Sequence, residues 1–94
     1  MQSFHTNLTD QLMDTILKIK TKKDLYNFFE DVCTIKEILD MSKRLEAAKL
    51  LDKGDSYNEI IKKLEISTAT LSRVSKALNY GTGGYKNAIS KKEA

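Results

Sequence analysis

The chain has 94 residues and a mass of 10.7 kDa, 40% of its residues are hydrophobic, and 16 basic against 13 acidic residues give a net charge of +3. A chain this short buries only about 60 to 65% of its unfolded surface and supports one core, so we expect a single domain over residues 1–94. One cysteine, Cys33, and one histidine, His5, exclude an intrachain disulfide and a zinc site. Without an apolar run of roughly 18 residues or a secretory signal, we expect a soluble, cytoplasmic protein with no membrane partner.

Two apolar stripes with helical spacing occupy the first third of the chain. The first predicts a helix over about residues 7–20, capped by Thr6 or the residue after it. Thr21 and Asp24 resemble a capping box and open a second helix over residues 22–32. The two stripes consist of Leu8, Leu12, Ile16 and Ile19, and of Leu25, Phe28, Phe29 and Val32.

A longer helix follows over residues 35–53. Thr34 and Glu37 form a capping box at its start, and Gly54 is suited to a left-handed cap at its end. The expected apolar face consists of Ile38, Leu39, Leu45, Ala48 and Leu51.

Two short helices are predicted next, within residues 56–79. Ser56 and Glu59 form the capping box of the first helix, and residues 65–67 separate it from the second, which Ser67 or the next residue caps. The second helix is expected to turn Leu71, Val74 and Leu78 inward.

We therefore predict an all-α protein of five to six helices. No stretch shows sustained period-two alternation, and hairpin signals such as Asn-Gly are absent. Residues 81–94 form a tail in which Tyr85 to Ser90 has the pattern of one more helical turn; no role can be assigned to residues 91–94.

The last two helices have the length and spacing of a helix-turn-helix. A helix that enters the major groove needs small or hydrogen-bonding side chains on its exposed N-terminal half, and basic residues nearby to bind phosphates. An ordinary αα-hairpin with a polar outer face is the alternative. The predicted base-reading residues are Thr68, Ala69, Thr70 and Ser72, and the predicted phosphate-binding residues are Lys62, Lys63, Arg73, Ser75 and Lys76.

The distribution of charge agrees with a DNA-binding C-terminal half. Residues up to Ile66 include 11 basic and 12 acidic side chains, net −1, whereas the residues from Ser67 onward include five basic and one acidic, net +4. A local basic surface on a near-neutral body suits phosphate binding. A basic tail that only improves solubility would give the same distribution.

The sequence resembles the tryptophan-repressor superfamily. The resemblance is carried by STATLSRVS at 67–75, with EI at 59–60 and CTIKE at 33–37, while LNYGTGGYK at 78–86 resembles the YerC/YecD-type branch; it covers about Phe4 to Lys86. The resemblance implies an intertwined homodimer, formed through the N-terminal helices, that binds operator DNA by its helix-turn-helix. The apolar stripes fit such an interface, although they could also fill the core of a monomer.

The same resemblance implies a possible effector pocket at Thr34, Arg44 and Arg73. Each residue also has a simpler role: Thr34 caps a helix, Arg44 can pair with an acidic residue one turn earlier, and Arg73 can bind a phosphate. Tryptophan-binding members have glycine directly after the last of these arginines, whereas this chain has Val74, whose branched side chain would intrude on a pocket shaped for indole. We expect no cofactor; a small-molecule effector of unknown identity is left open, but the expected effector is not free tryptophan.

Two functions follow from these observations. The first is a homodimeric, sequence-specific transcription regulator, a repressor, whose partner is double-stranded DNA. The second is a helical protein-interaction module that keeps the fold but uses Phe28, Phe29 and the stripe from Leu8 to Ile19 to bind another protein. An enzyme is not expected, because Cys33 has no evident His or Asp partner and the glycines at 81–84 do not follow a strand as a phosphate-binding loop requires.

Overall fold

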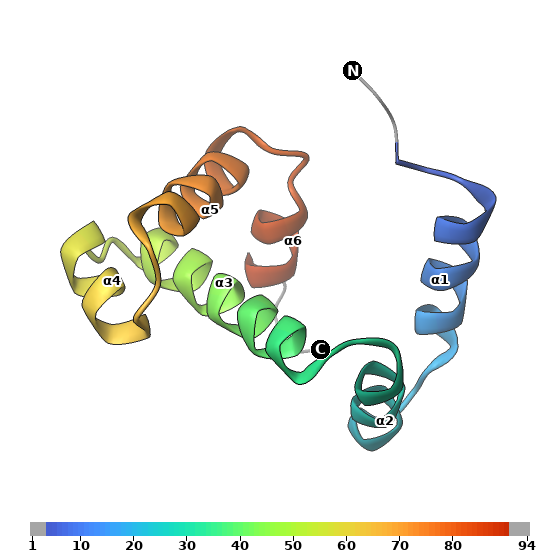
Figure 1. The fold of residues 1–94 in the computed structure, drawn as a ribbon. Coiled ribbons are helices and arrows are strands. Elements are labelled where there is room, and N and C mark those ends of the chain that lie inside the picture. The colour runs from blue at the N-terminus through green and yellow to red at the C-terminus, as the bar shows by residue number, and fades with distance from the viewer. Residues whose placement is uncertain (1–3, 91–94) are drawn as a thin grey trace. The chain divides into compact units, whose positions relative to one another are not determined.

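The computed structural model describes residues 4–90, which form six helices and no strand (Figure 1). This confirms the predicted all-α class. Within the same residues, no helix is both long enough and apolar enough to span a membrane. The helices are α1 (Asn7–Lys18), α2 (Lys22–Val32), α3 (Ile35–Lys53), α4 (Tyr57–Leu64), α5 (Thr68–Tyr80) and α6 (Gly84–Ser90).

Local caps set most of the helix boundaries. At the start of α3, the Thr34 hydroxyl accepts from the Glu37 N–H at 3.1 Å, and the Glu37 carboxylate accepts from the Thr34 N–H at 2.8 Å. The predicted capping box is therefore present. At the other end of α3, Gly54 has φ +108° and its N–H donates to the Leu50 carbonyl at 3.1 Å, as expected for a left-handed cap.

The first helix ends two residues earlier than predicted. It stops at Lys18, and Ile19 is already extended, with φ −75° and ψ 129°. The reason lies in the next helix: Thr21 adopts an extended conformation so that its hydroxyl can accept from the Asp24 N–H at 3.1 Å. A chain that must be extended at Thr21 cannot continue the helix to residue 20.

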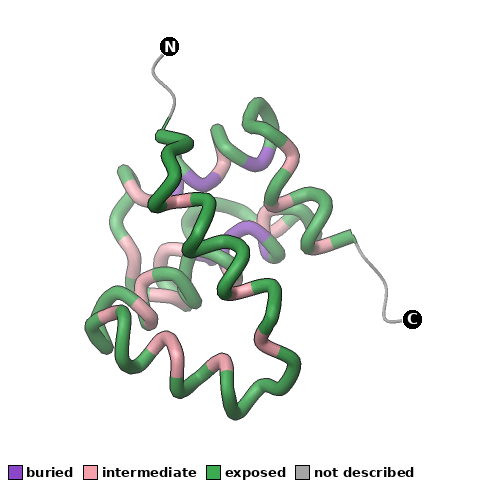
Figure 2. Tube along the Cα trace, turned by 90° about the vertical axis from the view of Figure 1, so that its right-hand side faces the viewer, coloured by how far each residue is buried: buried purple, intermediate pink, exposed green. Residues whose placement is uncertain are grey.

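The chain divides into two compact units, and the N-terminal unit ends at Ile38. Among residues 4–38 none is buried (Figure 2). Of the stripe predicted for α1, Leu8 and Leu12 are 76% and 37% exposed, while the rings of Phe28 and Phe29 in α2 lie 5.9 Å apart and are only half-buried. The predicted stripes exist as helix faces, but they fill no core within one copy of the chain.

The C-terminal unit, which begins at Leu39, contains the core. The inward positions predicted for α5, namely Leu71, Val74 and Leu78, are confirmed as buried. The face predicted for α3 is partly wrong, because Leu39 and Leu45 are 55% and 40% exposed. Burial in α3 begins only where α3 packs with α4 and α5. The main core cluster consists of Ala47, Ala48 and Leu50 of α3, Ile60 of α4, and Leu71 and Val74 of α5.

Candidate nucleic-acid interface

Helices α4 and α5 are joined by residues 65–67 and share the core through Ile60 and Leu71, both fully buried. The turn is left-handed at Glu65, whose φ is 55°, and the Glu65 N–H donates to the Ile61 carbonyl at 2.8 Å. Ser67 then caps α5 by accepting from the Thr70 N–H at 3.0 Å. The sequence contains no glycine or asparagine at position 65 that would have indicated this turn.

The start of α4 is fixed by the predicted capping box. The Glu59 carboxylate accepts from the Ser56 N–H at 3.0 Å and from the Ser56 hydroxyl at 3.1 Å, and the Ser56 hydroxyl accepts from the Glu59 N–H at 3.2 Å. The hydrogen bond from the Ser56 backbone, followed by that from its hydroxyl, lowers the pKa of Glu59 from its ordinary value of 4.5.

This shift predicts a pH-dependent contribution to stability. Because the pKa of Glu59 is lower in the folded chain, the carboxylate stabilises the fold above pH 4.5, and that contribution is lost as the pH falls through the lowered pKa. Glu59→Gln should therefore lower the melting temperature at neutral pH and leave it unchanged in strongly acidic solution. Glu30→Gln, the same change at an exposed position of α2, is the control and should have no effect at neutral pH. An equal loss for Glu59→Gln at both pH values would contradict the assignment.

The predicted base-reading residues lie in the first turns of α5. Thr68 and Ser72 are exposed and follow each other at a spacing of four, with exposed Ala69 beside them. Leu71 and Val74 occupy the opposite, buried side of the helix. Thr70 differs from the other predicted residues, because it is half-buried and its hydroxyl accepts from the Ser67 hydroxyl at 2.9 Å. Thr70 therefore takes part in the cap of α5.

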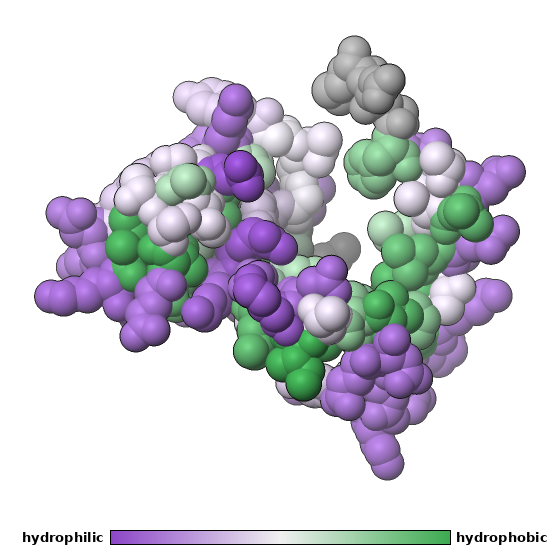
Figure 3. All heavy atoms as spheres, viewed as in Figure 1, coloured by the Kyte–Doolittle hydropathy of each residue, from purple (hydrophilic) through white to green (hydrophobic). Residues whose placement is uncertain are grey.

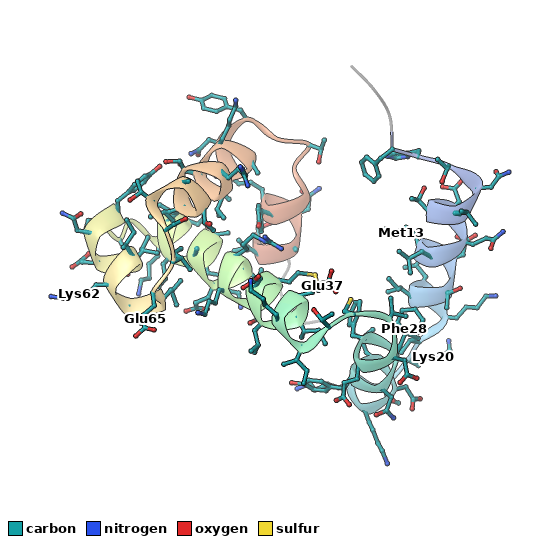
Figure 4. All side chains as sticks on the ribbon, viewed as in Figure 1. Met13, Lys20, Phe28, Glu37, Lys62 and Glu65 are labelled. Carbon is teal, nitrogen blue, oxygen red and sulfur yellow. The ribbon has the colours of Figure 1, made fainter. Side chains whose placement is uncertain are left out.

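Four of the five predicted phosphate-binding residues are exposed cations: Lys62, Lys63, Arg73 and Lys76. Lys62 projects from the outer side of α4 (Figure 4), and none of the four forms an ion pair with any residue between 4 and 90. Ser75 is half-buried; its hydroxyl lies 3.4 Å from the Asn79 amide, which donates to the Ser75 carbonyl at 3.0 Å. The basic groups are thus available to phosphate, whereas Ser75 is already engaged.

Two of the three predicted effector residues meet in one place. Arg44 and Arg73 line an open pocket of about 270 Å³, which Val74, Ala77 and Tyr85 complete. Thr34 belongs to the N-terminal unit, where it caps α3, and is not among the lining residues. The motifs of the sequence indicate no role for Tyr85; the signal that could have found it is its spacing of four from Ile89, which is typical of a packed face of a short helix.

Metal binding and nucleophilic attack are two other kinds of chemistry that protein side chains can support. Over residues 4–90, no group of three or more His, Cys, Asp or Glu side chains is arranged to hold a metal ion. Cys33 is half-buried at the C-terminal end of α2, where its N–H donates to the Phe29 carbonyl at 2.8 Å.

Comparison with known proteins assigns the fold. Residues 7–93 match the family model described as Trp repressor protein. YerC, an uncharacterized protein of Bacillus subtilis, is 45% identical over 80 residues, which make up 85% of this chain and 77% of YerC. The crystal structure of a TrpR-like protein from Eubacterium eligens has a TM-score of 0.86 at 48% identity and covers 89% of this chain and 87% of its own.

A second solved structure, of a candidate Trp repressor from Staphylococcus aureus, also has a TM-score of 0.86. It is 36% identical and covers 90% of this chain and 85% of its own chain. The match to the family model and the relatives above 30% identity both extend across the α4–α5 pair and most of the remaining helices. This chain therefore belongs to the Trp repressor family.

Proposed function

We propose that this chain is a sequence-specific, DNA-binding transcription regulator, a repressor, that acts as a homodimer through α4 and α5. One observation carries the proposal: the exposed side of α5 combines small polar groups with cations that have no ion-pair partner among residues 4–90. A helix with small side chains can bring its backbone close to base edges, and cations beside it neutralise phosphates. Membership of this chain in the Trp repressor family supports the same function.

In this proposal the two kinds of residue have different tasks. Thr68, Ala69 and Ser72 approach the bases, with Thr70 contributing mainly by holding the first turn of α5. Lys62, Lys63, Arg73 and Lys76 bind phosphates and set the register. Ser75 adds a weaker contact, because its hydroxyl oxygen accepts from the Asn79 amide and only its hydroxyl hydrogen is left to donate to a phosphate. Two-fold symmetry then requires half-sites roughly one helical turn, about 34 Å, apart.

The homodimer is part of the proposal because α1 and α2 have no buried residue. Hydrophobic side chains are visible along α1 (Figure 3), and Leu8 and Leu17 are highly exposed in a single copy. Exposed apolar faces of this extent are typical of obligate interfaces. A second copy would cover them and complete the single domain expected over residues 1–94.

Free tryptophan is not the effector in this proposal. Val74 is buried and lines the pocket at Arg44 and Arg73, where Tyr85 also lies, so an indole ring would meet two side chains in the space it needs. Isothermal titration of the purified protein with tryptophan should give no saturable heat. A dissociation constant in the micromolar range would contradict this prediction.

The proposal is tested by measuring affinity for a random-sequence duplex as a function of salt. Four phosphate-binding cations in each of two protomers predict a steep dependence, in which log Kobs falls against log salt with a slope of about −7 when all eight neutralise a phosphate. The alternative function, a protein-interaction module that uses Phe28, Phe29 and the stripe from Leu8 to Ile19, predicts no measurable binding even at low salt. That result would refute the DNA-binding proposal.

A further inference from the structure

The last helix, α6, packs directly on the proposed reading helix, α5. Tyr85 and Ile89 lie four residues apart on α6, and both pack against the core cluster that contains Leu71 and Val74 of α5. Both side chains are half-buried. The C-terminal half of α5 is thus held by α6, while its N-terminal half shares Leu71 with α4.

Two of the three glycines at the corner between α5 and α6 occupy positions that disfavour a side chain. A side-chain carbon on Gly81 would collide with the carbonyl group of Ala77, to which the Gly81 N–H donates at 3.0 Å. Gly83 has φ +94°, and its carbonyl accepts from the Asn87 N–H at 2.8 Å. A side-chain carbon on Gly84, by contrast, would meet nothing within 4 Å. The corner therefore folds α6 back onto α5 in one defined arrangement.

A second, weaker contact joins α6 to α3. The Lys86 ammonium lies 3.4 Å from the Asp52 carboxylate, and the two side chains are 54% and 40% exposed. An ion pair with this much solvent access contributes little. The packing of Tyr85 and Ile89 is therefore the main interaction that keeps α6 in place.

Tyr85 occupies a particular position on this surface. It lines the pocket that contains Arg44 of α3 and Arg73 of α5, and it also lines the open hollow beside Gly81 and Thr82. Its ring thus borders α3, α5 and the corner between α5 and α6. Removal of the ring would open the space next to Val74 and Ala77 on α5. Surrounding side chains close such a space only partly, so α5 could settle in more than one position.

We propose that α6 is an internal brace for DNA binding and that Tyr85 is its main positioning residue. The inference rests on the proposed function, because it concerns how α5 is presented to DNA. Groups that read base edges must be held to within about half an ångström, and supporting residues outside the contact surface provide that precision. Tyr85 contacts no base in this scheme; it fixes the angle of the helix whose first turns do.

The test uses the full chain and two matched pairs of variants. Tyr85→Ala removes the ring, whereas Tyr85→Phe keeps it; Gly81→Ala strains the corner, whereas Gly84→Ala does not. For each variant, affinity is measured for a site selected from random duplexes and for an unrelated duplex, well below the melting temperature. Tyr85→Ala and Gly81→Ala should lower the specific-to-unrelated affinity ratio by about 10- to 100-fold, comparable to losing one base contact. Tyr85→Phe and Gly84→Ala should stay within about twofold of the unmodified chain.

The ratio separates positioning from simple loss of stability, because a folded but merely weakened protein would keep it. Should Tyr85→Ala fail to fold, Ile89→Val removes one methyl group from the same contact and should still lower the ratio measurably. If Tyr85→Ala folds and keeps the specific-to-unrelated affinity ratio, the proposed positioning role of α6 and Tyr85 is wrong, and the proposed function stands. If the unmodified chain selects no site at all, the proposed function fails, and the brace fails with it.

Discussion

Arg73→Glu is expected to remove most of the chain's affinity for DNA, by about 100-fold or more at fixed salt. Arg73 is exposed on α5 and has no ion-pair partner among residues 4–90. A hydrogen bond from a charged group contributes about 1.5 to 3 kcal/mol, a carboxylate in its place adds repulsion from phosphate, and a homodimer suffers the loss twice. Fluorescence anisotropy with a labelled duplex measures the effect.

Two further measurements define what Arg73 does. The salt dependence should become shallower by about two in slope for a dimer, since one phosphate contact is lost in each protomer. Lys49→Glu, the same change in charge at an exposed position of α3, is the control and should cost far less affinity. Equal losses for the two variants would mean that only net charge matters and that α5 does not dock as proposed.

The second large effect concerns assembly. The double change Leu8→Glu with Leu17→Glu should convert a dimer into a species with the 10.7 kDa mass of one chain. Both side chains are highly exposed in a single copy, so a carboxylate there would be harmless to a monomer. Within an interface, each change would lose about 1.5 to 3 kcal/mol of the free energy gained by burying a leucine side chain, and would place a charge in an apolar contact.

Light scattering coupled to size exclusion measures this outcome directly. Gln11→Glu introduces the same charged group at an exposed polar position of α1 and should leave the dimer intact. The unmodified chain should elute with twice the mass of one copy. A single-chain mass for the unmodified protein would contradict the dimer and would leave the apolar faces of α1 and α2 to the protein-interaction alternative.

Features that depend on short-range hydrogen bonds could be predicted from the sequence. The capping boxes of Thr34 with Glu37 and of Ser56 with Glu59 join residues three apart, so both partners lie within four consecutive residues of the sequence. The cap at Gly54 follows from the one residue type that tolerates its backbone conformation. A box at the start of α1 was missed because its second partner is Thr9, whose hydroxyl replaces the usual Glu or Gln.

Features that depend on distant segments could not be predicted in this way. Helical spacing placed Leu45 on an inward face, yet burial in α3 begins at Ala47, because only that part of the helix packs with α4 and α5. The pocket that brings Arg44 together with Arg73 joins residues 29 positions apart. Tyr85 lies further along the chain still, and its place beside both arginines depends on how the glycine corner turns α6.

Sequencing the genomic DNA that the protein retains tests most directly whether α5 reads bases. The purified protein is incubated with sheared genomic DNA of its source organism at about 0.15 M salt, where nonspecific contacts are weakened, and the retained fragments are sequenced. Our account predicts enrichment of a two-fold symmetric site with half-sites about one helical turn apart. Retention of no fragment, or of all fragments equally, would contradict it.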